Sequence, residues 1–281
     1  MVLASMDMMS WGVGQVVAKR ATDRLGAVTM VLLVSVIDGC LYLLLFVLLA
    51  GPMSATWETY AFAVASAVTG MAGYILYYEA LLRGNVAVVG TISAGSPIIT
   101  IAGAVLFLGE TPTLNQGLGI VLLVAVILIL SYEPIGEEWR IPAAVLLSIG
   151  ILILWGVWGL LTKVAVNDPG FDSYHIFAFY AITNFVMGPP YYFLRRKRAP
   201  APDPSRAAYA TAIVGVLLLI VGIAATTIAL SIGDVSLVSA VSGSYPVVTA
   251  FVAFLFLKEK VTTMRIMSLA FFIPGIVLVA F

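Results

Sequence analysis

The chain has 281 residues, of which 62% are hydrophobic and 10% charged, and its mean hydropathy is +1.11. A soluble domain is roughly half apolar and about a quarter charged, so the composition excludes a water-soluble protein and predicts one that lies in the lipid bilayer. The net charge of zero argues against a nucleic-acid partner, and the single cysteine, Cys40, and single histidine, His175, predict no disulfide within the chain and no metal or cofactor site.

Ten stretches are apolar over about the 20 residues that a helix needs to cross the hydrocarbon core. In chain order the predicted spans are 2–18, 27–49, 58–82, 86–108, 113–131, 141–163, 173–194, 207–231, 235–257 and 262–281. The first stretch has no charged residue before its apolar run and no small-residue cleavage site, so we interpret it as a span and not as a signal peptide. The connections are short, which predicts an all-α membrane protein without an extramembrane domain.

Two parts of the chain carry the same pattern. A shift of 149 residues aligns Pro97 with Pro246 and Glu110 with Glu259, with no gap between the two pairs. Apolar composition alone would not align a proline and a glutamate at the same time, so we interpret the pattern as an internal duplication.

The opening spans of the two parts also match. A shift of 144 residues aligns "WGVGQVVAK", Trp11–Lys19, with "WGVWGLLTK", Trp155–Lys163. The sequence therefore predicts two five-helix repeats, 1–132 and 133–281. Because five is odd, the second repeat must enter the membrane in the opposite orientation to the first.

The basic residues are divided unequally between the two faces of this arrangement. Thirteen of the 14 lysines and arginines follow the odd-numbered spans, and only Lys163 lies on the other face. The thirteen are Lys19, Arg20, Arg24, Arg83, Arg140, Arg195, Arg196, Lys197, Arg198, Arg206, Lys258, Lys260 and Arg265. The positive-inside rule places the basic face in the cytoplasm, so we expect a multi-pass protein of the cell membrane with both termini outside.

The paired prolines lie at matching depth in two predicted spans. A proline inside a helix removes a backbone hydrogen bond and kinks the helix, and in lipid the freed carbonyl needs a polar neighbour. Ser93, Ser242 and Tyr245 lie close to the prolines in sequence. We therefore expect Pro97 and Pro246 to kink helices that line a cavity, although prolines and serines also serve simply to pack spans together.

The chain resembles the drug/metabolite transporter superfamily, and specifically its EamA branch. The resemblance is carried by the two Trp-Gly pairs that open the repeats and by the block "YYEALLRGNVAVVGTISAGSPIITIAGAVLFLGE", Tyr77–Glu110. The second copy, "IALSIGDVSLVSAVSGSYPVVTAFVAFLFLKE", Ile228–Glu259, matches as well. The resemblance implies ten helices in two inverted five-helix repeats around a central cavity, and a role in moving small metabolites.

Three acidic residues lie within the predicted spans, where an ionisable group is costly and therefore a functional candidate. Asp38 is in the middle of its span with no basic residue within one turn, whereas Asp7 is near the start of the first span. Glu79 has Arg83 four residues later, which also allows a purely structural ion pair. We take Asp38, Asp7 and Glu79 as candidates for proton coupling.

Aromatic and uncharged polar residues complete the candidate site. The tyrosines of the third span recur at helical spacing, which is typical of packing as well as of a binding surface that would suit an organic cation or an aromatic solute. The substrate-binding candidates are Trp11, Gln15, Asp38, Tyr74, Tyr78, Ser93, Pro97, Trp155, Trp158, Asn184, Ser242, Tyr245 and Pro246.

These observations favour a secondary transporter, because inverted repeats commonly hold a substrate site near the bilayer midplane where the halves meet. The expected partners are the lipid bilayer and a small solute such as an amino acid, an amine or a related metabolite. A membrane-embedded lipid-modifying enzyme is the alternative, but the sequence has no nucleophile–base set and no phosphate-binding glycine loop, so we predict that the protein is not an enzyme. A receptor or scaffold would not explain an inverted duplication.

Overall fold

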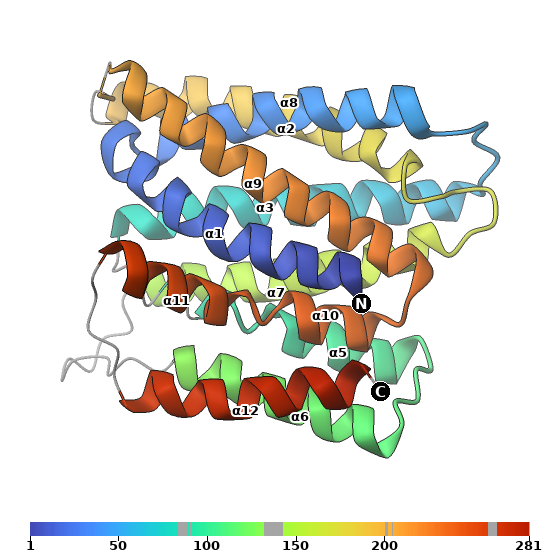
Figure 1. The fold of residues 1–281 in the computed structure, drawn as a ribbon. Helices are drawn as coiled ribbons and strands as arrows, with labels where there is room; N and C mark the ends of the chain where they lie inside the picture. Colours follow the sequence, from blue (N-terminus) through green and yellow to red (C-terminus); the bar gives the residue numbers. More distant parts are fainter. Residues whose placement is uncertain are drawn as a thin grey trace.

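The structure, a computed structural model, describes residues 1–83, 89, 92–131, 143–199, 202–203, 205–257 and 263–280. Within these ranges the regular elements are α-helices and one short 3-10 helix (Figure 1). The elements are α1 Val2–Leu25, α2 Ala27–Leu49, α3 Trp57–Arg83, α5 Ser96–Phe107, α6 Leu114–Ser131, α7 Ala143–Val166, α8 His175–Arg195, η1 Arg196–Arg198, α9 Arg206–Ile232, α10 Val235–Ser242, α11 Tyr245–Leu257 and α12 Thr263–Ala280.

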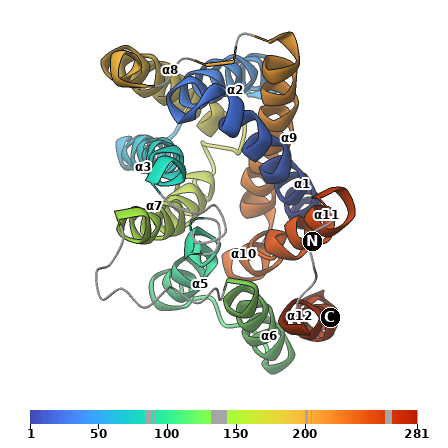
Figure 2. The ribbon, with the colours of Figure 1, turned by 90° about the vertical axis from the view of Figure 1, so that its left-hand side faces the viewer.

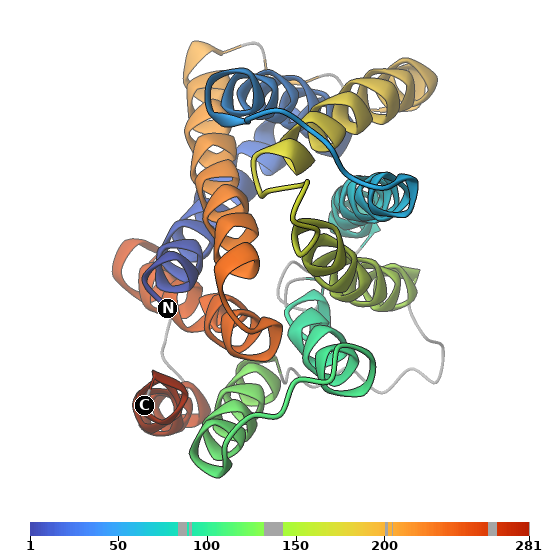
Figure 3. The ribbon, with the colours of Figure 1, turned by 90° about the vertical axis from the view of Figure 1, so that its right-hand side faces the viewer.

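The long helices lie roughly side by side, and both chain termini lie toward the same end of the bundle (Figure 1). The principal pairs are α1 with α9, α3 with α7, α2 with α8 and α6 with α12. Seen end-on, α5 and α10 lie between the α6–α12 pair and the remaining helices (Figures 2 and 3). Helices from the two ends of the sequence are therefore interleaved, and each half of the chain is packed largely against the other half.

Glycine allows close approaches in two further helix pairs, α1 with α11 and α7 with α5. A Cβ atom built on Gly12 of α1 would lie 2.5 Å from Val248 Cβ of α11, and one built on Gly156 of α7 would lie 2.6 Å from Ile99 Cβ of α5. Real Cβ atoms do not approach so closely. Small residues at such positions let helix backbones come together, which is how helices associate in lipid, where burial of apolar surface supplies no driving force.

Four helices of the described chain are long and apolar enough to cross a membrane: Ala27–Leu49, Trp57–Ala80, Ala143–Val166 and Arg206–Ile232. Shorter apolar helices are Ser96–Phe107, Leu114–Val126, Val235–Thr249 and Ala270–Val279. These findings support a helical membrane protein. The boundary between the expected repeats, at 132–133, lies outside the described residues.

At both prolines the structure has a break between two helical segments in place of the expected kink within one helix. In place of one kinked helix over 235–257, α10 ends at Ser242 and α11 begins at Tyr245, and a turn at 94–95 likewise precedes α5. Pro97 and Pro246 fall in the first turn of the second segment, where the amide hydrogen would have no intrahelical partner and proline is tolerated. Backbone bonds from Val247 N to Ser244 O and from Ile98 N to Gly95 O close the two turns.

Candidate functional site

A cavity of about 120 Å³ lies inside the helix bundle. Its walls come from α1, α2, α3, α5, α7, α8, α9, α10 and α11. Both proline breaks reach it, through Ser96 and Pro97 on one side and through Gly243 and Tyr245 on the other. The site is therefore built by helices from both ends of the sequence.

Two carboxyl groups line the cavity. Asp38 of α2 is 2% exposed and Asp7 of α1 is 7% exposed. The hydroxyl groups of Thr226 and Ser242 lie against the Asp7 carboxyl group and are 3.1 Å from each other. Asp38 forms no hydrogen bond or ion pair with any described residue, and its Oδ1 atom is buried without a partner. The two acids therefore differ, because protein hydroxyl groups lie beside the Asp7 carboxyl group and no described protein group bonds to the Asp38 carboxyl group.

Trp11 is the centre of an aromatic wall. Its ring centroid is 6.0 Å from that of Tyr74, 5.9 Å from that of Trp155 and 6.1 Å from that of Tyr245. Tyr74 and Trp155 are themselves 5.6 Å apart in an edge-on arrangement. These rings come from four different helices, so the wall exists only when α1, α3, α7 and α11 are assembled.

A second group of aromatic residues is held in place by hydrogen bonds. Trp158 Nε1 donates to the Tyr180 hydroxyl at 3.0 Å, and that hydroxyl is 2.8 Å from Thr162 Oγ1. Ser66 Oγ is 2.7 Å from the same Thr162 hydroxyl. This network sets the orientation of the Trp158 and Tyr180 rings in the cavity wall.

The aromatic lining is not the same in the two halves of the chain. Trp158 packs against Gly70, with its Cδ1 atom 2.9 Å from where a Cβ atom would be. Shifts of 144 and 149 residues relate these positions to Gly14 and Leu219, which are also in contact. In one pair the large residue, Trp158, is on α7 and the glycine is on α3, whereas in the aligned pair the glycine is on α1 and the large residue is Leu219 of α9. The Trp158 ring therefore lines the cavity from α7, and the aligned position on α1 is a glycine.

Unpaired polar atoms gather around the cavity. Within the described residues, the buried side-chain polar atoms without a protein hydrogen-bond partner are Asp7 Oδ1, Trp11 Nε1, Gln15 Nε2, Asp38 Oδ1, Tyr74 OH, Tyr78 OH, Asn184 Oδ1 and Tyr245 OH. Six of these eight residues line the cavity, namely Asp7, Trp11, Asp38, Tyr74, Asn184 and Tyr245. A buried polar atom without a partner costs about 1–3 kcal/mol, so such a group of atoms calls for water or a ligand in the cavity.

The structure brings most of the predicted site residues to the cavity. Those that line it are Trp11, Asp38, Tyr74, Pro97, Trp155, Trp158, Asn184, Ser242 and Tyr245, together with Asp7. Those that do not are Gln15, Tyr78, Ser93, Pro246 and Glu79. Tyr78 is 1% exposed and packs in the core, whereas Gln15 and Ser93 lie next to Tyr245, behind the lining.

Several lining residues were not among the candidates, including Tyr42, Thr100, Tyr180 and Thr226. Tyr42 follows Asp38 by four residues and so lies on the same face of α2, which is a signal that the sequence contained. Thr226 carries no comparable signal, because only the packing of α9 against α1 brings it to Asp7.

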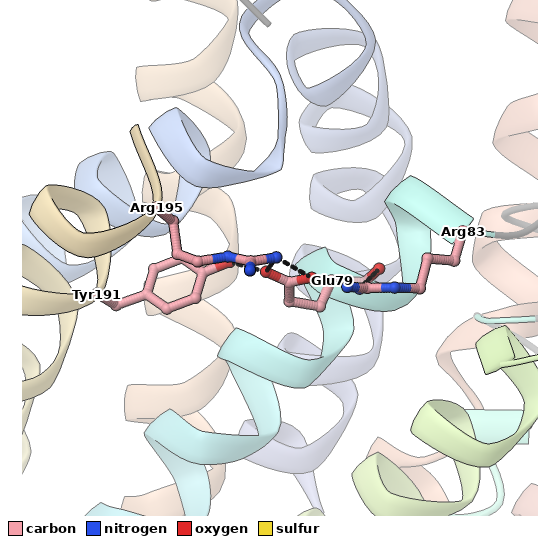
Figure 4. Close-up of polar contacts among 4 residues, drawn as sticks. All are labelled: Glu79, Arg83, Tyr191 and Arg195. Atoms are coloured by element: carbon pink, nitrogen blue, oxygen red, sulfur yellow. Dashed lines mark hydrogen bonds and ion pairs between the residues drawn. The ribbon is translucent and has the colours of Figure 1, made fainter. Parts of the chain in front are cut away.

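Glu79 forms an ion-pair cluster away from the cavity lining (Figure 4). Arg195 Nη2 of α8 donates to Glu79 Oε1 at 2.8 Å, and Arg83 and the Tyr191 hydroxyl donate to the same carboxylate. The sequence indicated the Arg83 partner but not the two partners from α8. With these donors around it, the Glu79 carboxylate ties α3 to α8.

The position of His175 at the start of the predicted span 173–194 predicts a solvated side chain, but the side chain is only 3% exposed. Its Nδ1 atom accepts from the backbone N–H of Asp172 at 2.9 Å, and its Nε2 atom lies 2.9 Å from Gly51 O. The imidazole ring therefore joins two connecting segments, and the expectation of a solvated histidine is wrong. Among the basic residues counted above, Arg140, Lys258 and Lys260 lie outside the described residues, as does the side chain of Arg265.

The fold and the site together define a helical membrane protein with a largely apolar, aromatic cavity into which a few polar side chains project. Comparison with known proteins agrees, since the model of the EamA-like transporter family matches residues 1–132 and 142–281. The chain therefore belongs to the EamA-like transporter family, which confirms the resemblance seen in the sequence and indicates a membrane transporter of the drug/metabolite type.

Two further similarities were found. The alignment with a solved crystal structure covers 99% of this chain and 94% of the chain in that structure, with a TM-score of 0.78 and 13% sequence identity. This likeness shows the fold alone. An uncharacterized protein of Methanocaldococcus jannaschii is 44% identical over 70 residues, which are 25% of this chain. The match covers 51% of that relative, so it spans about half the length of the curated protein.

Proposed function

We propose that the protein is a ten-span secondary transporter, which carries a small organic solute through the central cavity by alternating access. One observation supports this proposal most directly, namely the cavity inside the bundle, of whose lining residues six carry a buried polar atom without a protein partner among the described residues. A structural bundle would gain stability by pairing or removing such atoms. A transporter needs such atoms, because they form hydrogen bonds with the solute in place of the water molecules that the solute loses on entering the cavity.

The contacts between helices support an inverted repeat. If α1, α3 and α11 correspond to α7, α9 and α5, then the α1–α9 pair corresponds to α7–α3, and the α1–α11 pair to α7–α5. The pairs α2–α8 and α6–α12 each join a helix to its own counterpart. When the halves 1–132 and 133–281 are interchanged, each of these helix pairs therefore maps onto another of the pairs or onto itself, as a two-fold arrangement requires.

Single residues follow the same exchange. Trp11 and Trp155 are counterparts in the sequence, and their rings meet edge-on at 5.9 Å. Hypothetical Cβ atoms on the counterparts Gly12 and Gly156 would lie 3.0 Å from Tyr245 O and Ser96 O, which are counterparts as well. Alternating access follows naturally from such an arrangement, since exchange of the two halves' conformations would open the same cavity to the opposite side.

The expected orientation remains part of the proposal. The described lysines and arginines at the C-terminal ends of α1 and α3 and just after α8 include Lys19, Arg83 and Lys197. Lys163 lies at the other end of the bundle and donates to Leu230 O and Gly233 O at 2.8 Å each. By the positive-inside rule the former end faces the cytoplasm and both termini lie outside.

Purified protein in liposomes tests the proposed function. We expect exchange of at least one unmodified solute from a panel of amines, amino acids and sugar nucleotides, above the rate of protein-free liposomes. Asn184→Leu, which removes an unpaired oxygen from the cavity, should slow that exchange, whereas Thr211→Val on α9, whose hydroxyl bonds only within its own helix, should not. Chemical conversion of a solute without flux would instead support a membrane-embedded enzyme.

A further inference from the structure

We propose that the solute is a small organic cation whose ammonium group is bound at Asp38, an inference that rests on the transport function proposed above. Two aspartates line the cavity, and no lysine, arginine or histidine is among its described lining residues. A buried carboxylate needs a counter-charge or several hydrogen bonds. Since the described protein supplies neither to Asp38, a cationic solute is the chemical group that the cavity lacks.

Hydrogen-bond capacity around Asp38 matches an ammonium group. Asp38 Oδ1 and Asn184 Oδ1 are acceptors without a protein donor, and both residues are more than nine-tenths buried. Both residues line the same cavity, Asp38 from α2 and Asn184 from α8, and these two helices pack against each other. An ammonium group carries donors and no acceptor, so it can donate to such oxygens without adding an unpaired acceptor of its own.

The aromatic lining provides the second half of the site. Tyr42 and Tyr74 line the cavity, and their hydroxyl groups lie within the electrostatic influence of both Asp38 and Asp7. The faces of tryptophan and tyrosine rings attract cations, most strongly when water is excluded. The apolar part of the solute would lie against the same rings.

The two acids are not equivalent in this arrangement. Asp7 already has the hydroxyl groups of Thr226 and Ser242 beside it, whereas Asp38 has no such neighbours recorded. We therefore assign the principal contact with the cation to Asp38, and a weaker electrostatic contribution to Asp7. This order distinguishes a specific ammonium site from a diffuse negative potential, in which the two acids would contribute equally.

The same lining disfavours other charge types. An anionic solute would bring a third negative charge into a cavity that holds two carboxyl groups and, in the described lining, no basic side chain. The carboxylate of a zwitterion would meet the same repulsion from the two carboxyl groups. Selectivity would thus come from repulsion as well as attraction.

Four probes of similar shape and different charge test the proposal on the protein in detergent: 2-phenylethylamine, 2-phenylethanol, 3-phenylpropanoate and phenylalanine. Binding is measured by tryptophan fluorescence and by the melting temperature, since Trp11, Trp155 and Trp158 line the cavity and a ligand raises the melting temperature. We expect 2-phenylethylamine to bind most tightly. Asp38→Asn should weaken it roughly ten- to a hundredfold, as for the loss of a hydrogen bond to a charged group, and Asp7→Asn should weaken it less.

Glu58→Gln is the matched control, because Glu58 is an exposed acid at the start of α3, and it should leave the amine affinity unchanged. Tighter binding of the zwitterion or the anion, or an amine affinity that Asp38→Asn does not change, overturns the assignment. The ranking of the four probes on the unmodified protein tests it even where a variant does not fold.

The experiment separates this inference from the transport proposal. Binding of the amine as described, with no exchange of any solute by protein-containing liposomes, keeps the cation site and overturns transport. Exchange of an amino acid or a sugar nucleotide by the same liposomes, with no binding of the amine, keeps transport and overturns the cation site.

Discussion

The hydroxyl group of Thr249 in α11 donates a hydrogen bond of 3.1 Å to the carbonyl oxygen of Gly12 in α1. The same bond recurs between Thr100 of α5 and Gly156 of α7, at 2.9 Å. Each threonine lies three residues after one of the two aligned prolines, and each glycine belongs to one of the two Trp-Gly pairs. The residues on which the proposed duplication rests thus bond to each other between the two proposed repeats.

This relationship predicts equal losses of stability from equivalent substitutions. Thr249→Val and Thr100→Val should each lower the free energy of unfolding by about 0.5–1.5 kcal/mol, the typical contribution of one hydrogen bond, because each removes one bond between helices. Melting temperatures in detergent measure the effect, with Thr211→Val as the control that breaks only a bond within its own helix. A large loss at one threonine and none at the other would argue against equivalent contacts.

The glycine partners allow a stronger test. Gly12→Ala and Gly156→Ala would each place a methyl group within 3 Å of the facing helix, and overpacking of this kind typically costs about 1–3 kcal/mol. Gly117→Ala in α6 is the matched control, since no atom lies within 4 Å of a Cβ atom there and alanine is the better helix former. We expect a lower melting temperature for the first two variants only; tolerance of both would show that the helices are less closely packed than described.

The Glu79 cluster is predicted to be structural. Glu79→Gln should lower the free energy of unfolding by about 1–3 kcal/mol, because Arg195 and Tyr191 lose a charged acceptor, while the affinity of the cavity for its solute stays as in the parent. Thermal unfolding and solute binding, measured on the same preparation, separate the two effects. A variant of parental stability that has lost the pH dependence of transport would instead support the coupling role considered for Glu79.

Orientation is testable with single cysteines in a Cys40→Ser background, since Cys40 is the single native cysteine. Asn167, after α7, and Lys197, in η1, are exposed at opposite ends of the bundle. A membrane-impermeant thiol reagent added to intact cells should label Asn167→Cys and spare Lys197→Cys until the cells are permeabilised. The reverse pattern would place the termini in the cytoplasm.

Asp168, in the connection between α7 and α8, is expected to stabilise the fold in a way that depends on pH. The Thr59 hydroxyl donates to its carboxylate at 2.5 Å and the Gly170 N–H at 2.8 Å, and these bonds hold the pKa of Asp168 below its ordinary value of 3.8. A carboxyl group whose pKa is lower in the folded protein stabilises the fold above its ordinary pKa, and this contribution is lost as the pH falls through the lower value.

Asp168→Asn should therefore lower the melting temperature at neutral pH, and the difference from the parent should shrink on acidification below 3.8, the ordinary pKa of this group. Melting curves recorded from neutral pH down to about pH 3 measure this dependence, with Glu58→Gln as a control at an exposed acid. A difference that stays constant over the whole range would mean that the bonds to Asp168 do not depend on its charge.

The sequence by itself determined the bilayer environment, the helical fold and the family. Those properties follow from composition, from the length of the apolar stretches and from the order of a few motifs, none of which depends on how the helices pack. It also made Asp38 a candidate, because an ionisable group within a span is rare enough to stand out, and Trp11, because it belongs to one of the two matched Trp-Gly pairs.

Only the tertiary structure decided which of the candidates line the cavity. Tyr74 and Tyr78 are one helical turn apart in α3, yet Tyr74 reaches the cavity and Tyr78 is buried in the core. In water the apolar face of a helix marks its interior side, but in lipid both the buried face and the outer face are apolar. Sequence periodicity therefore shows which residues share a face, while the packing of the neighbouring helices decides what that face meets.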